Sequence, residues 1–172
     1  MPTHHGSGFF FAMWYKKFAL DDLFLREAVY LYNFRKLNGS ITEGRSQIYG
    51  AAGEILVKHF YEKTNNVIHH GTHDYDMIIN GYTIEVKTKR RTVEPMLHYN
   101  GSVWSGNTKQ NCDFYFFCQI SEDYKFGYLL GYVSREEFME KSFILNKGEV
   151  DDQFTVRDTC RNMKYADMRR VK

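Results

Sequence analysis

The chain has 172 residues, 43% of them hydrophobic, and a formal net charge of +2. This length and composition suit one domain with a core of its own, and the weak net charge excludes an overall polycation, so any basic surface for nucleic acid must be local. The 3 cysteines are odd in number and lack metal-ligand spacing, which favours free thiols in a reducing cytoplasm. The apolar run at residues 9–14 is too short to span a membrane, so we expect no membrane partner.

Residues 1–44 are expected to form an N-terminal extension with one helix, packed on a domain that comprises residues 45–172. Asp21 or Asp22 can cap this helix, which runs to about Lys36. The chain is therefore predicted to begin with a helical addition to its main domain.

A second helix is predicted from residues 40–43, which read Ser-Ile-Thr-Glu and form a capping box. The helix runs to about Lys63 and carries an apolar stripe that faces a core. Gly50 and Gly53 lower its intrinsic helix propensity, so we expect a close backbone approach at these positions.

Residues 75–87 predict a β-hairpin, because Asn80-Gly81 is the strongest short turn signal and both positions tolerate positive φ. A two-residue turn fixes the pairs Ile79–Tyr82, Ile78–Thr83, Met77–Ile84 and Asp76–Glu85. Two carboxylates would then face each other with a repulsion on the order of 3 kcal/mol. The pair Asp76–Glu85 therefore suggests an occupant, most simply a divalent cation.

Further elements lie on both sides of this hairpin. Three segments are expected to be strands, and a fourth a strand or loop, in this order: 67–70, 113–120, 126–133 and 154–157. Ser134 opens another capping box for a short helix to about Lys141. The polar stretch 92–111 has weak periodicity and is expected to hold a short helix or an ordered loop. This order of elements predicts a mixed α/β or α+β domain.

Asp76, Glu85 and Lys87 are the residues with the clearest chemical pattern, because alternation places them on one face of the hairpin. Hydrolysis of a phosphodiester needs a metal to activate water, and carboxylates with a backbone carbonyl suit Mg²⁺. A neighbouring lysine can position the water or stabilise the pentavalent phosphate. The alternative is an exposed face of solvated charges, on which Lys87 merely neutralises Glu85.

Asp76 and the run Glu85-Val86-Lys87, which begins nine residues on, resemble the signature of the PD-(D/E)xK nuclease superfamily, with Tyr75 in place of the proline of the motif. The helix at residues 50–57 is similar to the first core helix of that superfamily, where an acidic residue often joins the metal site. The resemblance covers roughly residues 46–133. It implies a restriction-endonuclease-like core with a mixed four- to five-stranded sheet flanked by helices. The helix usually found between the third and fourth core strands is poorly visible.

The resemblance also implies roles for individual residues. Asp76 and Glu85 would bind Mg²⁺, for which Mn²⁺ can substitute, and the Val86 carbonyl would be a third ligand. Lys87 would be the catalytic lysine. Glu54 would be an accessory metal ligand, directly or through water.

Several of these positions have competing interpretations. Glu54 can instead be a surface acid that pairs with Lys58 one helical turn on. Asp74 is a rival for the first acid, or a partner of Lys87. The histidines within residues 69–73 could suggest a zinc site, but their spacing matches no recognised zinc pattern.

Residues 87–91 form the only dense basic run in the interior of the chain. Alternation puts Lys89 and Arg91 on the face of the two acids and Arg90 on the opposite face. Together with Lys109, these residues would hold the phosphate backbone of DNA beside the scissile bond. The alternative is a solvated strand end.

The expected function is that of a metal-dependent DNA endonuclease of restriction-like or homing type, in the cytoplasm of a prokaryotic or phage-infected cell. Holliday-junction resolvases and exonucleases share the same core and remain open as alternatives. A homodimer would supply the two sites that duplex cleavage requires. An alternative of another class is a non-catalytic nucleic-acid-binding protein, although a pure binder gains nothing from carboxylates that face phosphates.

Overall fold

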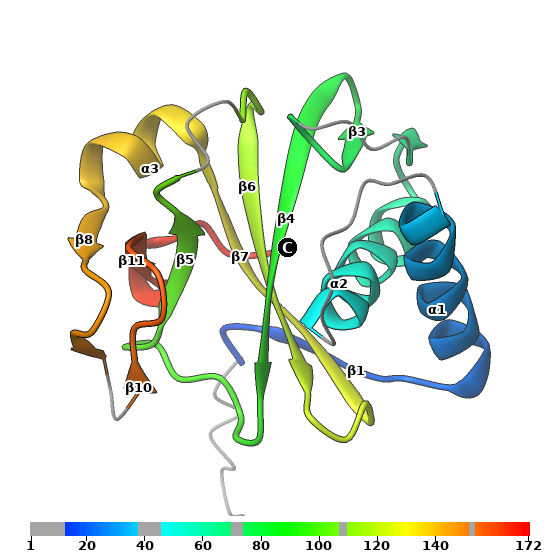
Figure 1. The fold of residues 1–172 in the computed structure, drawn as a ribbon. Helices are drawn as coiled ribbons and strands as arrows, with labels where there is room; N and C mark the ends of the chain where they lie inside the picture. Colours follow the sequence, from blue (N-terminus) through cyan, green and yellow to red (C-terminus); the bar gives the residue numbers. More distant parts are fainter. Residues whose placement is uncertain (1–12, 38–45, 70–73, 107–109, 152–153) are drawn as a thin grey trace, which may run out of the picture.

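The computed structural model describes residues 13–37, 46–69, 74–106, 110–151 and 154–172. Its centre is a curled, mixed six-stranded sheet. Two helices cover one face of this sheet, and a three-stranded sheet with a further helix lies on the other side (Figure 1). The prediction of a mixed α/β domain is confirmed.

The main sheet has the strand order β1-β7-β6-β4-β3-β2. Its strands are β1 (Lys16–Ala19), β2 (Val67–Ile68), β3 (Met77–Ile79), β4 (Tyr82–Arg91), β6 (Phe114–Ser121) and β7 (Phe126–Ser134). β4 and β6 run parallel, whereas the other neighbours are antiparallel. The sheet exceeds the predicted four to five strands because β1, which lies within the expected N-terminal extension, pairs with β7 at the sheet edge.

Strand β6 separates two hydrophobic cores, because successive side chains of a strand point to opposite faces. Phe116 and Cys118 pack in the core on the helical side, whereas Tyr115 and Phe117 pack in the core under the small sheet. The continuous aromatic run that predicted this strand is therefore explained by cover on both faces.

Helices α1 (Asp22–Leu37) and α2 (Ser46–Tyr61) pack against each other, and α2 lies on the main sheet (Figure 1). Of the two predicted caps of α1, Asp21 is the one observed: its Oδ1 accepts a hydrogen bond from the Phe24 N–H at 2.8 Å. Residues 38–45, which include the expected capping box of the second helix, lie outside the described residues.

Gly53 allows α2 to approach β4 closely. A Cβ atom at Gly53 would overlap the Thr88 side chain, with Thr88 Cβ only 3.0 Å away, whereas a Cβ at Gly50 would meet nothing within 4 Å. The predicted close approach is therefore confirmed for Gly53 and wrong for Gly50. This contact holds the next residue, Glu54, against the sheet.

The small sheet has the order β5-β11-β8 and consists of β5 (Asn100–Trp104), β8 (Phe143–Leu145) and β11 (Cys160–Lys164). The expectation of a helix or loop at residues 92–111 is wrong for the part that forms β5. This segment becomes a strand because it pairs antiparallel with β11, far along the chain, and buries Val103 in the second core.

Helix α3 (Arg135–Lys141) and strand β10 (Phe154–Thr155) agree with the sequence patterns, whereas strand β9 (Val150–Asp151) and a 3-10 turn were not predicted. Helix α3 begins after the predicted cap Ser134, whose Oγ accepts a hydrogen bond from the Glu137 N–H at 3.2 Å. Strand β10 pairs with β9, and the 3-10 turn, η1, spans Tyr165–Asp167. All three cysteines are free, as predicted.

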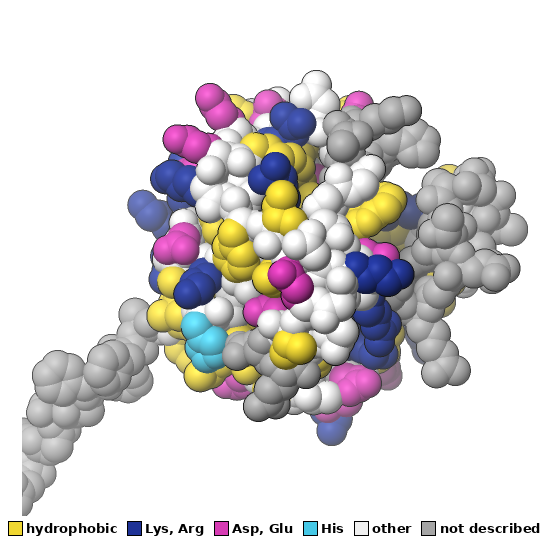
Figure 2. Space-filling view, turned by 60° about the vertical axis from the view of Figure 1, so that its left-hand side comes forward, with side chains coloured by type: hydrophobic (Ala, Val, Ile, Leu, Met, Phe, Trp, Pro, Cys, Tyr) yellow, Lys and Arg dark blue, Asp and Glu magenta, His cyan; other side chains and the backbone are white. Residues whose placement is uncertain are grey.

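The face that carries the small sheet and α3 mixes both charges. Figure 2 shows Lys and Arg side chains interspersed with Asp and Glu side chains over the described part of this face. Recognition of phosphate on this face must therefore depend on a local site. Within the described residues, no helix combines the length and apolar character needed to cross a membrane.

Candidate functional site

The bend at Asp76 changes the predicted hairpin. The register is confirmed for the three pairs nearest the Asn80-Gly81 turn. It fails at Asp76, whose N–H donates to the Ile84 carbonyl at 2.9 Å, although Ile84 already pairs with the residue after Asp76. Asp76 lies in a bend before β3, and the ladder ends at the pair Met77–Ile84. The strand register therefore does not impose the direct opposition of like charges on Asp76 and Glu85.

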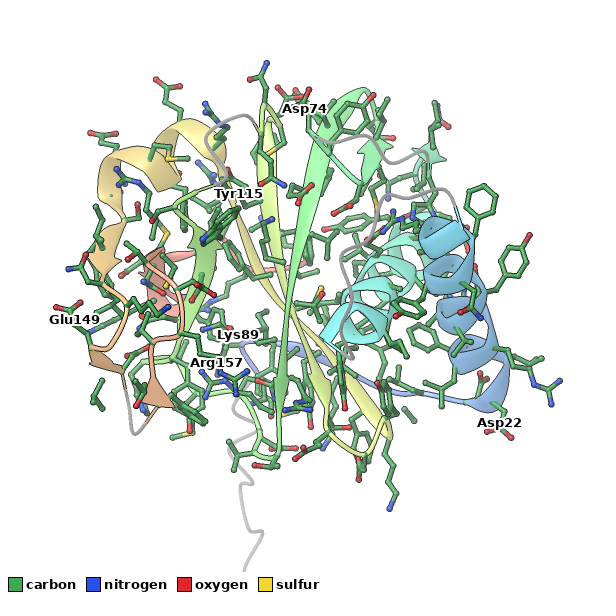
Figure 3. The ribbon with its side chains drawn as sticks, viewed as in Figure 1. Asp22, Asp74, Lys89, Tyr115, Glu149 and Arg157 are labelled. Atoms are coloured by element: carbon green, nitrogen blue, oxygen red, sulfur yellow. The ribbon has the colours of Figure 1, made fainter. Side chains whose placement is uncertain are left out.

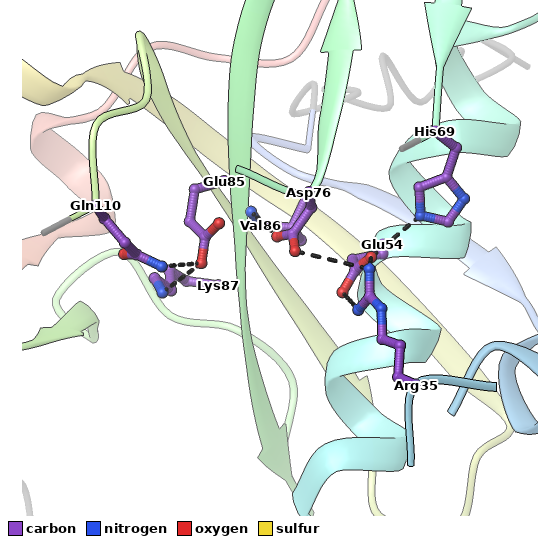
Figure 4. A network of polar contacts seen from close by, with 8 residues as sticks. All are labelled: Arg35, Glu54, His69, Asp76, Glu85, Val86, Lys87 and Gln110. Carbon is purple, nitrogen blue, oxygen red and sulfur yellow. Dashed lines mark hydrogen bonds and ion pairs between the residues drawn. The ribbon is translucent and has the colours of Figure 1, made fainter. Parts of the chain in front are cut away.

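The Asp76 carboxylate nevertheless reaches the predicted strand. Its Oδ2 accepts a hydrogen bond from the Val86 N–H at 2.7 Å, and Val86 stands between Glu85 and Lys87 in β4 (Figure 4). A side-chain contact, rather than strand register, therefore brings the first acid to the other two residues of the motif.

Glu54 and Arg35 form a buried ion pair beside Asp76. Glu54 is 5% exposed, and Arg35, near the end of α1, donates to both of its carboxylate oxygens, with Nη2 at 2.6 Å from Oε2. Arg35 Nη2 also lies 3.9 Å from Asp76 Oδ1, and His69 Nε2 lies 3.1 Å from Glu54 Oε2 (Figure 4). One guanidinium thus lies between the acid of α2 and the acid before β3.

These contacts correct one of the alternatives. Glu54 is not a surface acid paired with Lys58, because Lys58 pairs with Glu27 at 3.0 Å. Within the histidine run, His69 contacts Glu54, and residues 70–73 lie outside the described residues.

Glu85 lies on the opposite side of Asp76 from Glu54 (Figure 4). It is 7% exposed, and its Oε1 lies 2.7 Å from Lys87 Nζ. The same oxygen accepts a hydrogen bond from Gln110 Nε2. Lys87 is therefore held in place by Glu85, two residues away on the same face of β4.

Arg35 and Gln110 are the two site residues that the sequence patterns did not reveal. Arg35 lies on a helix for which no role beside the acids was predicted, and Gln110 lies in the polar stretch with weak periodicity. Neither belongs to a motif, so only the tertiary structure brings them to the acids.

The pKa of Asp76 is determined mainly by burial and by the neighbouring acids. Burial raises the pKa of the Asp76 carboxyl well above its usual range, and the charges of Glu54 and Glu85 raise it further. The Val86 N–H and the Arg35 guanidinium act in the opposite direction. A buried acid with a raised pKa, surrounded by further acids, is typical of functional sites and would be stabilised as a carboxylate by a cation.

The side chains as described are bonded to each other rather than arranged around one point. Among the described residues, no group of three or more His, Cys, Asp or Glu side chains is placed to hold a metal ion. Asp76 and Glu85 are nevertheless oxygen donors on either side of Val86, and Mg²⁺ binds through one or two carboxylates while it keeps several waters. The chemistry of the donor set therefore fits Mg²⁺, with Val86 able to offer its main-chain carbonyl.

The basic run divides between the two faces of β4 as predicted. The Arg90 guanidinium lies 5.5 Å from the ring centroid of Tyr49 on α2, whereas the Arg91 guanidinium lies 4.3 Å from that of Tyr99 on the other side. Lys109 lies outside the described residues. The strand thus continues from the acids into a basic segment.

No protein-family model matches this chain, and no curated protein matches it. What the protein does is therefore inferred from its own residues.

Proposed function

We propose that this protein is a Mg²⁺-dependent deoxyribonuclease that hydrolyses phosphodiester bonds, with a PD-(D/E)xK core. The observation that carries the proposal is the 2.7 Å hydrogen bond from Val86 N–H to Asp76, which brings the first acid to Glu85 and Lys87. The raised pKa of Asp76 supports it, because burial and the nearby acids make the charged form of this carboxyl unfavourable without a cation.

The order of elements also supports the proposal. A helix with a buried acid, α2, precedes the antiparallel strands β2, β3 and β4, and β6 then runs parallel to β4. This order agrees with the mixed four-stranded core that the motif resemblance implies. One departure is β5, a strand that stands where the superfamily usually has a helix.

The residues of the site would have distinct tasks. Asp76, Glu85 and the Val86 carbonyl would hold Mg²⁺, which activates water and neutralises charge on the phosphate when it is bound. Lys87 orients the attacking water or stabilises the phosphate in the transition state, and its bond to Glu85 fixes its direction. Glu54 holds Arg35 and adds negative charge beside Asp76.

The proposal is tested by cleavage of supercoiled plasmid, linear duplex, single-stranded DNA and a four-way junction, each with Mg²⁺, Mn²⁺ or EDTA. Lys87→Ala should lower the rate by about 10²- to 10⁴-fold, the usual contribution of such a group. Lys125→Ala removes the same charge from a side chain that is 73% exposed in the β6–β7 turn and should cut as the wild type does.

The preferred substrate would separate restriction-like or homing cleavage from junction resolution and from exonuclease activity. Efficient cutting of both strands would imply the homodimer, since each strand needs a site. If no substrate is cut under any metal, the deoxyribonuclease proposal is wrong, and DNA binding without cleavage would favour the non-catalytic alternative.

A further inference from the structure

A cavity of about 240 Å³ lies beside the second half of β4, where the small sheet and the β9–β10 hairpin approach it. Four basic residues contribute to its lining, Lys89, Arg90, Arg91 and Arg157, together with Asp151 and Asp158. Figure 3 shows Lys89 and Arg157 close together beside β4. The cavity thus joins basic side chains from two segments that lie far apart in the sequence.

Lys89 is a half-buried cation, and within the described residues its Nζ makes no hydrogen bond or ion pair. Burial and the neighbouring charge of Arg91 lower the pKa of Lys89 to about 8, against the opposing effect of Asp151 and Cys160. A desolvated ammonium of this kind is stabilised when an anion binds it.

Arg91 is held in a fixed orientation at the same cavity. Its guanidinium carbon lies 4.3 Å from the ring centroid of Tyr99 and 5.2 Å from that of Phe154. Its Nε is buried and has no hydrogen-bond partner among the described residues. Aromatic contacts fix a guanidinium while its N–H edge can still bind an oxyanion in a bidentate manner.

The two acids of the lining offset the charge of these cations only in part. Asn100 Nδ2 donates to both carboxylate oxygens of Asp151, at 3.1 and 3.0 Å, so that β5 holds this acid. Asp158 is exposed, where water and salt screen its charge. Basic side chains therefore exceed acidic ones around the cavity.

We propose that this cavity binds a phosphoryl group of a nucleic-acid strand through Lys89, Arg91 and Arg157. Its volume is below the roughly 300–1,000 Å³ of sites for drug-sized ligands, which suits a phosphoryl group rather than a whole nucleotide. The group is either a terminal phosphate or an internal phosphodiester, which offer the same oxygens.

The assignment of the phosphoryl group to a nucleic-acid strand rests on the proposed function. Lys89 is two residues from Lys87 on the same face of β4, a separation of roughly 7 Å. A phosphoryl group in the cavity would therefore fix the strand near the bond that is cut.

The test is the binding of single-stranded oligonucleotides in EDTA, measured by fluorescence anisotropy over a range of salt concentrations. The oligonucleotides carry a 5′-phosphate, a 3′-phosphate or hydroxyl groups at both ends. Lys89→Ala and Arg157→Ala should each weaken binding several-fold and reduce the salt slope by about one phosphate contact. Lys125→Ala, the matched loss of an exposed charge, should change neither quantity.

Each outcome has a defined meaning. Tighter binding of one phosphorylated end that disappears in Lys89→Ala supports a terminal phosphate, and equal weakening for all end groups supports an internal phosphodiester. If Lys89→Ala and Arg157→Ala bind as Lys125→Ala does, or if the wild type binds none of the oligonucleotides, the cavity does not bind phosphate. Binding is measured in EDTA, so failure of the deoxyribonuclease proposal is seen separately, as absent cleavage by the wild type with Mg²⁺ or Mn²⁺.

Discussion

Strand β4 passes through two regions that differ in how their charged side chains are paired. In the first region, Glu54 and Glu85 are each bonded to a basic side chain, Arg35 and Lys87 respectively. In the second, Lys89 has no bonded acid within the described residues, although acids line the same cavity. The first region must therefore exchange partners to bind a metal, whereas the second gains a partner when it binds an anion.

The largest effect on stability is expected from Arg35. Arg35→Ala leaves the carboxylate of Glu54 buried without its guanidinium, and removal of one partner of a buried ion pair costs about 3–5 kcal/mol. Chemical denaturation of the metal-free protein measures this loss. Arg26→Ala, an exposed change on the same helix, should have little effect.

The double variant Arg35→Ala/Glu54→Gln separates charge from packing. It should recover much of the lost free energy of unfolding, because no unpaired carboxylate remains. A single variant as stable as the wild type would show that the ion pair does not hold the acid region together.

A smaller loss is expected at the contact that holds Glu54 beside the sheet. Gly53→Ala places a Cβ against Thr88 and should reduce the free energy of unfolding by about 1–3 kcal/mol. Gly50→Ala is the matched control in the same helix, where the added methyl meets open space and should stabilise by about 0.5–1 kcal/mol. Equal effects of the two substitutions on thermal unfolding would contradict a close approach at Gly53.

Local signals predicted the elements of the acid region, but not how its charges are bonded. The Asn80-Gly81 turn and the alternating apolar residues determine the hairpin and most of its register. The bend at Asp76 depends on its hydrogen bonds with the Ile84 carbonyl and the Val86 N–H, which the turn signal does not specify. Arg35 reaches Glu54 from another helix, and such pairing depends on tertiary packing.

The basic cavity was less predictable for the same physical reason. Alternation correctly placed Lys89 and Arg91 on one face of β4. Arg157 reaches that face only because β5 pairs with β11 and the β9–β10 hairpin then lies over the strand. Pairing between segments so distant in the chain has no counterpart in the short-range pattern of residues 92–111.

Removal of the Asp76 carboxylate should moderately increase stability, whereas the Arg35 and Gly53 substitutions reduce it. The pKa of Asp76 is raised above its value of 3.8 in the unfolded chain, so the folded protein binds the proton more tightly and loses stability as pH rises from about 4 through the folded pKa. Asp76→Asn should therefore raise the metal-free unfolding temperature at pH 7–8, and this gain should vanish below about pH 4.

The same unfolding temperatures are then measured with Mg²⁺ present. Mg²⁺ should raise the unfolding temperature of the wild type and leave Asp76→Asn unchanged, because ligands that bind only the folded state stabilise it. Equal stabilisation of both proteins by Mg²⁺ would contradict Asp76 as a metal ligand, and a less stable metal-free variant would contradict the sign of its pKa shift.

The smallest expected effect is the pH dependence of oligonucleotide binding at the basic cavity. Only protonated Lys89 attracts phosphate, and the pKa of Lys89 is about 8, so oligonucleotide affinity should fall up to about tenfold between pH 7 and pH 9 at constant salt. The other charged residues of the lining are Arg90, Arg91, Arg157, Asp151 and Asp158. Lys89→Arg should flatten the profile, because a guanidinium does not lose its proton there.

Cys160 is the remaining lining residue that can lose a proton, so Cys160→Ser is the control for its contribution. The fall in affinity should persist in Cys160→Ser and disappear in Lys89→Arg, because the ammonium carries the charge that changes. A profile that stays flat in the wild type, or one that falls equally in Lys89→Arg, would mean that the ammonium of Lys89 does not meet the phosphate. The cavity would then attract the strand through its guanidinium groups alone.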